Sequence, residues 1–213
     1  MSPMPMFPLG SVLLPGAILP LHVFEPRYRA LVQDCLAADE HEFGVVLIDR
    51  GHEVGGGDVR RDVGTVARMV QVAQLEGGRY AVVAVGTRRI QVDEWLPDDP
   101  YPRAEVVDWP DDETDDQAGA GVEYLDELYR RVAARVRRIA ALAIELGDAA
   151  GDPCTELSDD PLVGSYQLAV LAPLSTADEY DLLGARGPRR RLVLLDERLD
   201  DVDATQQFRL ANS

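Results

Sequence analysis

The first half of the chain carries short apolar runs that are typical of β-strands. They are rich in Val and Ile, are separated by Gly or Pro, and cover residues 11–14, 18–24, 43–48, 63–75, 79–85 and 89–95. Between two of them, Glu76-Gly77-Gly78 is a turn signal that predicts an antiparallel hairpin. We therefore expect residues 1 to about 110 to be mostly strand.

One helix is predicted to interrupt these strands, because apolar residues recur there at positions i, i+3, i+4, i+7 and i+8. This apolar stripe consists of Tyr28, Leu31, Val32, Cys35 and Leu36. Pro26 suits the first helical turn. Since Cys35 lies on the stripe, its position favours core packing over a nucleophilic role. His22 lies in an apolar strand and is expected to be buried or half-buried.

The periodicity becomes helical in the second half of the chain. Residues 111–116 hold five acids in six positions and predict a hinge or loop. A long helix should follow and end at Gly147. Pro161 opens a second helix, and Ser175 with Asp178 is typical of a capping box for a third. The last helix carries an apolar stripe made of Leu192, Leu195, Leu199 and Val202.

Charge and composition exclude several classes of function. All 21 basic residues are arginine, so no lysine can serve in a P-loop, a Schiff base or a Ser–Lys dyad. The net charge of −17 argues against nucleic acids and anionic membranes as partners. Cys35 and Cys154 have no CxxC spacing, and no apolar stretch approaches the roughly 20 residues of a membrane span. A cytoplasmic location is therefore predicted.

Candidate chemistry along the chain is sparse. One cluster of acids and histidines consists of Asp39, Glu40, His41, Glu42, Asp49, His52 and Glu53. Because this cluster lacks the spacing of metal ligands, a solvated acidic surface is favoured over a metal site. No serine lies in a GxSxG context, and residues 55–57 do not form a dinucleotide loop. We predict no catalytic residue, metal or cofactor. Residues 189–191 place three arginines where they oppose the helix dipole, and we expect nearby acids, such as those of 111–116, to compensate.

A set of ordered motifs resembles the N-terminal domain of Lon proteases. The early motifs are Phe7-Pro8-Leu9, Leu14-Pro15-Gly16, Leu19-Pro20-Leu21 and Phe24-Glu25-Pro26-Arg27-Tyr28. Later motifs are Phe43-Gly44-Val45-Val46, Val63-Gly64-Thr65-Val66-Ala67, Gly86-Thr87-Arg88-Arg89, Ala172-Pro173-Leu174 and Arg191-Leu192. The resemblance is specific over the first 90 residues and looser afterwards.

The resemblance implies an α+β fold. A PUA-like antiparallel β-barrel with one inserted helix is expected over residues 1–110 and a helical subdomain over 117–211, joined by the acidic loop 111–116 into one Lon N-terminal-type domain. The implied function is that of a non-enzymatic module that binds unfolded or specific polypeptides and works beside a protease or a chaperone. A full Lon protease also carries an ATPase module and a Ser–Lys protease module, and this chain is expected to lack both.

The expected binding residues are Phe24, Arg27 and Tyr28, at the junction between a strand and the first helix. An aromatic pair beside an arginine is the composition that binding hot spots favour. A structural role, in which Phe24 and Tyr28 seat the helix on the barrel, is the alternative.

Two other functions compete with polypeptide binding. A PUA-like RNA-binding protein would need a basic stripe, for which the available residues are Arg27, Arg29, Arg60, Arg61, Arg88 and Arg89. A hydrolase with a site assembled only in space is the third hypothesis.

Overall fold

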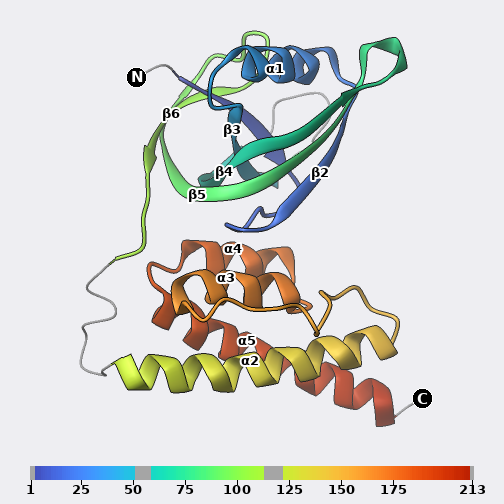
Figure 1. The fold of residues 1–213 in the computed structure, drawn as a ribbon, viewed down its shortest axis with the longest axis vertical. Helices are drawn as coiled ribbons and strands as arrows, with labels where there is room; N and C mark the ends of the chain where they lie inside the picture. The colour runs from blue at the N-terminus through green and yellow to red at the C-terminus, as the bar shows by residue number, and fades with distance from the viewer. Residues whose placement is uncertain (1–2, 51–58, 113–121, 212–213) are drawn as a thin grey trace. The chain divides into compact units, whose positions relative to one another are not determined.

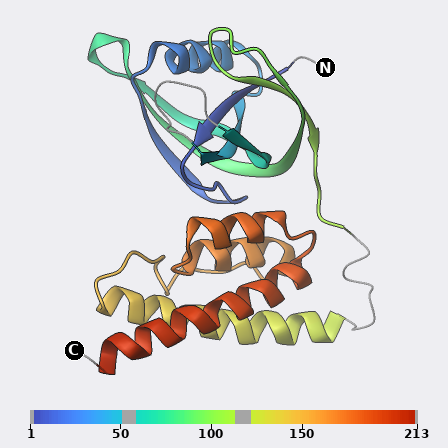
Figure 2. The ribbon, with the colours of Figure 1, turned by 180° about the vertical axis from the view of Figure 1, so that it is seen from behind.

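The computed structural model describes residues 3–50, 59–112 and 122–211. They divide into two compact units, Met1–Pro110 and Asp111–Ser213, which we call the β-unit and the helical unit. Figure 1 draws the β-unit in blue to green and the helical unit in yellow to red, and Figure 2 shows both from behind. No helix in the described ranges is long and apolar enough to cross a membrane.

The β-unit is built on one mixed sheet whose strand order is β2-β5-β4-β3-β1-β6, with a further pairing between β5 and β6. Its strands are β1 (Met4–Leu9), β2 (Ile18–Val23), β3 (Glu42–Arg50), β4 (Val59–Gln74), β5 (Tyr80–Leu96) and β6 (Arg103–Asp108). β1 and β3 run parallel, whereas the other pairings of these strands are antiparallel. The mixed sheet with its helices gives an α+β fold, as predicted. The expectation that all strands are antiparallel was wrong, because β1 pairs in parallel with β3, a partner that lies far along the chain and that local patterns do not encode.

The predicted hairpin is present between β4 and β5. Its turn is a short 3₁₀ helix, η1 (Glu76–Gly78), in which Gly77 takes a φ of 74° that glycine adopts without a steric penalty. The runs at 79–85 and 89–95 are parts of one continuous strand, β5. Gly86 joins them, and a side chain there would collide with the carbonyl oxygen of Leu14.

One predicted strand is absent, and two strands of the structure were not predicted. Residues 11–14 form no strand. Leu13 and Leu14 are buried instead, and the hydroxyl of Thr65 donates a 2.6 Å hydrogen bond to the Leu13 carbonyl. The strands β1 and β6 were not predicted. Pro5 and Pro8 interrupt the strand signal in β1, yet burial of residues such as Met6 and parallel pairing with β3 override it.

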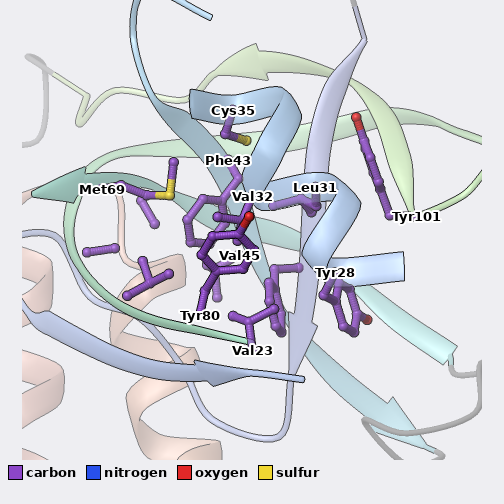
Figure 3. Close-up of a cluster of buried hydrophobic side chains, with 14 of the residues drawn as sticks. Val23, Tyr28, Leu31, Val32, Cys35, Phe43, Val45, Met69, Tyr80 and Tyr101 are labelled. Atoms are coloured by element: carbon purple, nitrogen blue, oxygen red, sulfur yellow. The ribbon is translucent and has the colours of Figure 1, made fainter. Parts of the chain in front are cut away.

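The helix α1 (Pro26–Ala37) covers the core of the β-unit, as Figure 3 shows. Four of the five residues of its predicted stripe are buried, while Leu36 is 40% exposed. Cys35 donates to the carbonyl oxygen of Glu42 at 3.3 Å, and burial raises the pKa of its thiol to about 12. The sulfur is therefore a core group and not a nucleophile, as the helical stripe indicated.

The helical unit contains α2 (Val122–Glu145), α3 (Pro161–Leu171), α4 (Thr176–Gly184) and α5 (Pro188–Ala211). The local start and stop signals are confirmed. Gly147 follows α2 with a φ of 82°, and Pro161 opens α3. The hydroxyl of Ser175 accepts a hydrogen bond from the backbone N–H of Asp178 and so caps α4.

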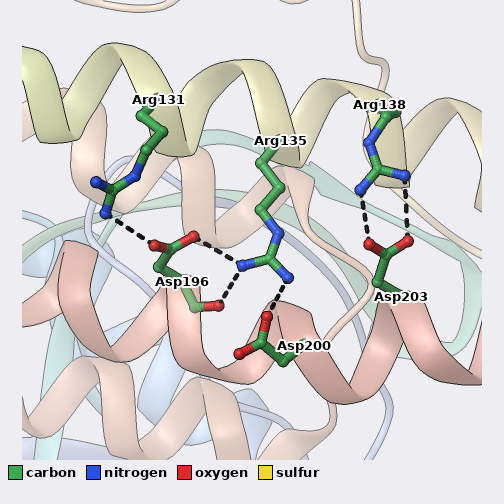
Figure 4. Close-up of polar contacts among 6 residues, drawn as sticks. All are labelled: Arg131, Arg135, Arg138, Asp196, Asp200 and Asp203. Atoms are coloured by element: carbon green, nitrogen blue, oxygen red, sulfur yellow. Dashed lines mark hydrogen bonds and ion pairs between the residues drawn. The ribbon is translucent and has the colours of Figure 1, made fainter.

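The helices α2 and α5 run parallel and are joined by ion pairs in a constant register (Figure 4). Arginines at three positions of α2, with spacing i, i+4 and i+7, each meet an aspartate 65 residues later on α5. The pairs are Arg131–Asp196, Arg135–Asp200 and Arg138–Asp203. Arg135 also contacts Asp196 at 2.8 Å. This ladder follows the register of two helices that also bury an apolar seam.

Arg191, at the start of α5, is fully buried and has several polar partners. It donates to both carboxylate oxygens of Asp111, at 2.8 and 3.0 Å, and to the hydroxyls of Ser165 and Tyr166 at 2.7 Å. The Tyr166 ring lies 3.5 Å from the guanidinium carbon. The expected compensation by an acid of residues 111–116 is therefore confirmed for Arg191, whose partner is Asp111.

Removing Arg191 should destabilise the helical unit strongly. We expect Arg191→Ala to lower its free energy of unfolding by about 3–5 kcal/mol, because Asp111 loses the counter-charge of a buried ion pair. The matched control Arg138→Ala breaks a pair whose arginine is 54% exposed and should cost at most about 1 kcal/mol. Urea unfolding followed by far-ultraviolet circular dichroism measures both. Equal losses would contradict this assignment.

Acid should weaken the ladder between α2 and α5. The hydrogen bonds from Arg138 hold the pKa of Asp203 below its usual range. Ionised Asp203 therefore stabilises the fold above the ordinary aspartate pKa of about 3.9, and this contribution is lost as the pH falls through the lower, folded-state value. We expect the urea midpoint of Asp203→Asn to fall less steeply than that of the wild type below about pH 4. Asp201→Asn, on the same helix, controls for the change in net charge, and parallel slopes for Asp203→Asn and wild type would refute the prediction.

Candidate functional site

A small apolar pocket lies where β2 leads into α1. It has a volume of about 190 Å³ and is lined by Phe7, Leu9, Pro20, Leu21, His22, Val23, Phe24, Glu25 and Tyr28. β2 ends at Val23, Glu25 is the N-cap of α1, and Pro26 begins the helix. The short connection thus brings the end of a strand, a helix cap and the first helical turn to one place. We call it the β2 pocket.

Two of the three predicted site residues, Phe24 and Tyr28, line the β2 pocket. Phe24 is 54% exposed, whereas Tyr28 is buried and its ring stacks on Phe7 with centroids 4.0 Å apart. The guanidinium of Arg27 lies 4.4 Å from the centroid of the Tyr28 ring and pairs with Glu25 at 3.0 Å. Tyr28 is thus held between Phe7 and Arg27, so it forms a fixed wall, and Phe24 is the exposed aromatic group.

His22 also lines the β2 pocket, and its expected burial was wrong because the side chain is exposed. Its ring centroid lies 6.3 Å from that of Phe24. Along β2 the exposed residues are Ile18, Pro20 and His22, while Val23 is buried. Successive side chains of a strand point to opposite faces of the sheet. Because Val23 faces the core, this alternation would have predicted that its neighbour His22 faces outward.

The arginines proposed for a basic stripe are largely neutralised by carboxylates. Arg27 pairs with Glu25, Arg60 with Asp98, Arg61 with Asp49, and Arg88 with both Glu42 and Asp108. Arg89 is buried, with its guanidinium carbon 4.8 Å from the Trp109 ring centroid. These pairs leave little free positive charge with which the β-unit could attract phosphates.

The described residues also offer few groups for catalysis or metal binding. Among them, no three His, Cys, Asp or Glu side chains gather around a possible metal position, while His52 and Glu53 of the sequence cluster lie outside the described ranges. Ser165, which is buried, accepts a hydrogen bond from Arg191 and donates one to the carbonyl oxygen of Leu162. An arginine is not a general base, so this contact does not activate the serine.

The helical unit has two larger hollows that are more polar. One, of about 390 Å³, lies beside α5, and its carboxylates Asp148 and Asp178 are paired with Arg209 and Arg198. The other, of about 760 Å³, lies along α2, where Arg137 donates to the carbonyl oxygen of Thr155 at 2.9 Å. Neither hollow combines an exposed aromatic ring with an apolar wall as the β2 pocket does.

Comparison with known proteins identifies the family. Residues 3–201 match the model of the ATP-dependent protease La (LON) substrate-binding domain. The Lon protease of Anaeromyxobacter dehalogenans is 33% identical over 70% of this chain, and Lon protease 2 of Myxococcus xanthus is 32% identical over 70% of it. In both cases the match spans 18% of the relative's own length.

Two solved structures share the fold over nearly the whole chain. A Lon N-terminal domain protein from Xanthomonas campestris has a TM-score of 0.60 and 30% identity, and the match covers 92% of this chain and 97% of that one. The N-terminal domain of the Mycobacterium avium complex Lon protease has a TM-score of 0.61 and 21% identity, with 94% and 99% covered. The family match over residues 3–201 confirms the resemblance seen in the motifs, and the chain belongs to the family of Lon substrate-binding domains.

Proposed function

We propose that the chain is a non-enzymatic module that recognises polypeptides, with Phe24, Arg27 and Tyr28 as the centre of its binding site. Membership of the substrate-binding family supports the substrate-recognition role. The observation that supports this site is the exposed ring of Phe24 at an apolar pocket that is also lined by Tyr28, whose ring is held by Phe7 and Arg27. Aromatic anchors beside preformed apolar pockets dominate the energetics of protein recognition.

The three residues have different roles in this proposal. Phe24 makes direct contact with an apolar side chain of the polypeptide. Tyr28 lines the pocket, and Arg27 keeps the Tyr28 ring in place through its cation–π contact and its pair with Glu25. Because a promiscuous site of this size gains little from any one segment, we expect a Kd of about micromolar or weaker.

The finer architecture is part of the same proposal. We assign the β-unit to a PUA-like barrel, because β6 pairs with both β1 and β5 and so returns the sheet toward itself. Residues 1–110 and 117–211 are the two subdomains of one Lon N-terminal-type domain. The partners are unfolded or specific polypeptides and, beside them, a protease or a chaperone in the cytoplasm. The family match concerns the substrate-binding domain and not the ATPase or protease modules, which supports a role without catalysis, cofactor or metal.

Truncating Phe24 tests the site directly. Since the ring is 54% exposed, Phe24→Ala should leave the Tm nearly unchanged. It should weaken binding of a permanently unfolded probe, fluorescent carboxymethylated α-lactalbumin, by roughly 5- to 30-fold, which corresponds to about 1–2 kcal/mol of lost apolar burial. The matched control is Phe208→Ala on α5, which removes another exposed phenylalanine and should bind as the wild type does. Equal affinity of Phe24→Ala and wild type would place the site elsewhere.

RNA binding, the competing function of a PUA-like protein, is expected to be absent. The chain has a net charge of −17, and four of the six arginines that could form a basic stripe are paired with carboxylates. A gel shift with single- and double-stranded RNA at about physiological salt should show no complex at submicromolar protein. An RNA complex that weakens steeply as the salt concentration is raised would favour RNA binding over polypeptide binding as the function.

A further inference from the structure

We propose that β2 binds its polypeptide as an added β-strand, along the edge of β2 that does not pair with β5. One apolar side chain of the segment then occupies the β2 pocket. This inference rests on the proposed function and specifies the conformation of the substrate: an extended segment that offers its own backbone N–H groups. Addition of a strand to an open sheet edge is a known mode of peptide recognition, but the argument here comes from the backbone of β2.

The direction in which each backbone group of β2 points follows from its ladder with β5. Gly86 N–H donates to the Ala17 carbonyl at 2.9 Å, just ahead of the first pair of the ladder, Ile18 with Val85. In an antiparallel pair the hydrogen-bonded positions recur every second residue. Leu19 and Leu21 therefore direct their N–H and C=O groups toward β5. The alternate positions direct theirs to the opposite, open edge; these are Ile18, Pro20 and His22.

The position of Pro20 is consistent with this alternation of backbone groups between the two edges of β2. It has no N–H, and it pairs with Val83 in an uninterrupted register from Ile18 to Val23. Proline is tolerated in a sheet where its missing donor would have faced an open edge. Within the described part of the chain, β2 pairs with β5 alone. The open edge thus presents two N–H donors, from Ile18 and His22, and three carbonyl acceptors, from Ile18, Pro20 and His22.

The open edge lacks the charged side chains that protect many natural edge strands. Charged side chains normally prevent an edge from pairing with other chains. The sequence of β2 is Ile-Leu-Pro-Leu-His-Val, without Asp, Glu, Arg or Lys, in a chain of which 28% is charged. Large apolar side chains stand exposed at both ends, with Ile18 at 70% and Phe24 at 54%. An uncharged edge flanked by apolar groups suits an apolar extended segment.

The β2 pocket adds side-chain recognition to this edge. Its volume of about 190 Å³ is below the range of roughly 300–1,000 Å³ that is typical of small-molecule sites, and it suits one apolar side chain. Pro20, His22 and Phe24 contribute to its lining, so the pocket is built partly on the strand whose edge is open. Backbone pairing would supply affinity for segments of many sequences, and the pocket would favour a large apolar side chain at one position.

The test uses the wild-type protein and a short fluorescent peptide that alternates threonine and valine around a central leucine. Two derivatives carry backbone N-methyl groups on every second residue. One is methylated at the odd-numbered positions and the other at the even-numbered positions. An added strand turns only one set of its N–H groups toward β2. One derivative should therefore bind more than about tenfold more weakly than the parent, since each lost hydrogen bond contributes about 0.5–1.5 kcal/mol, and the other should stay within about twofold.

A pair of variants examines the protein side of the same contact. His22→Pro removes the outward N–H of His22 without removing a donor to β5, and the extended backbone of the preceding residue is compatible with proline. It should bind the parent peptide about three- to tenfold more weakly than His22→Ala, which removes the ring alone. The Tm of each variant is measured alongside, and the peptide experiment does not depend on either variant folding.

The outcomes separate this inference from the proposed function. If the two N-methylated derivatives bind equally, whether strongly or weakly, strand addition is overturned. The site itself survives in that case as long as Phe24→Ala still weakens binding of the unfolded probe. Absence of any binding by the wild type would overturn both the proposed function and the inference that rests on it.

Discussion

The long strand β5 holds the β-unit together, because it pairs with three other strands. Its first part, residues 80–85, lies between β2 and β4, and its last part, residues 90–96, pairs with β6. Gly86, between the two parts, lets the backbone at Leu14 approach closely. Among the described strands, β2 pairs with β5 along Ile18–Val23. The same arrangement leaves the other edge of β2 without a strand partner in the described part of the chain.

The helical unit combines its apolar seam with one buried charge pair and a row of more exposed ones. Arg191 is a fully buried cation and requires Asp111 and the surrounding hydroxyls, since an unpaired buried charge is costly. The ladder between α2 and α5 engages aspartates of a chain whose net charge is −17. The acid excess thus includes carboxylates with defined structural partners, in addition to those that only face solvent.

The candidate site combines a rigid part and an exposed part. Tyr28 is fixed by Phe7 and Arg27, so the pocket wall is present before any ligand arrives. Phe24 is 54% exposed, and the outer edge of β2 has no strand partner among the described residues. A preformed pocket reduces the entropy cost of binding, and backbone pairing tolerates many sequences. Both properties suit the polypeptide recognition that we propose for this member of the substrate-binding family.

The sequence by itself determined the elements whose signals are local. Periodicity and caps placed the five helices, and Pro26 with the residues around it located the junction that forms the β2 pocket. Only the tertiary structure decided the rest, because strand pairing joins residues far apart in the chain and local patterns do not encode the partner. The strands β1 and β6 therefore escaped prediction. The open edge of β2 likewise depends on which edge β5 occupies, and only the assembled sheet determines that.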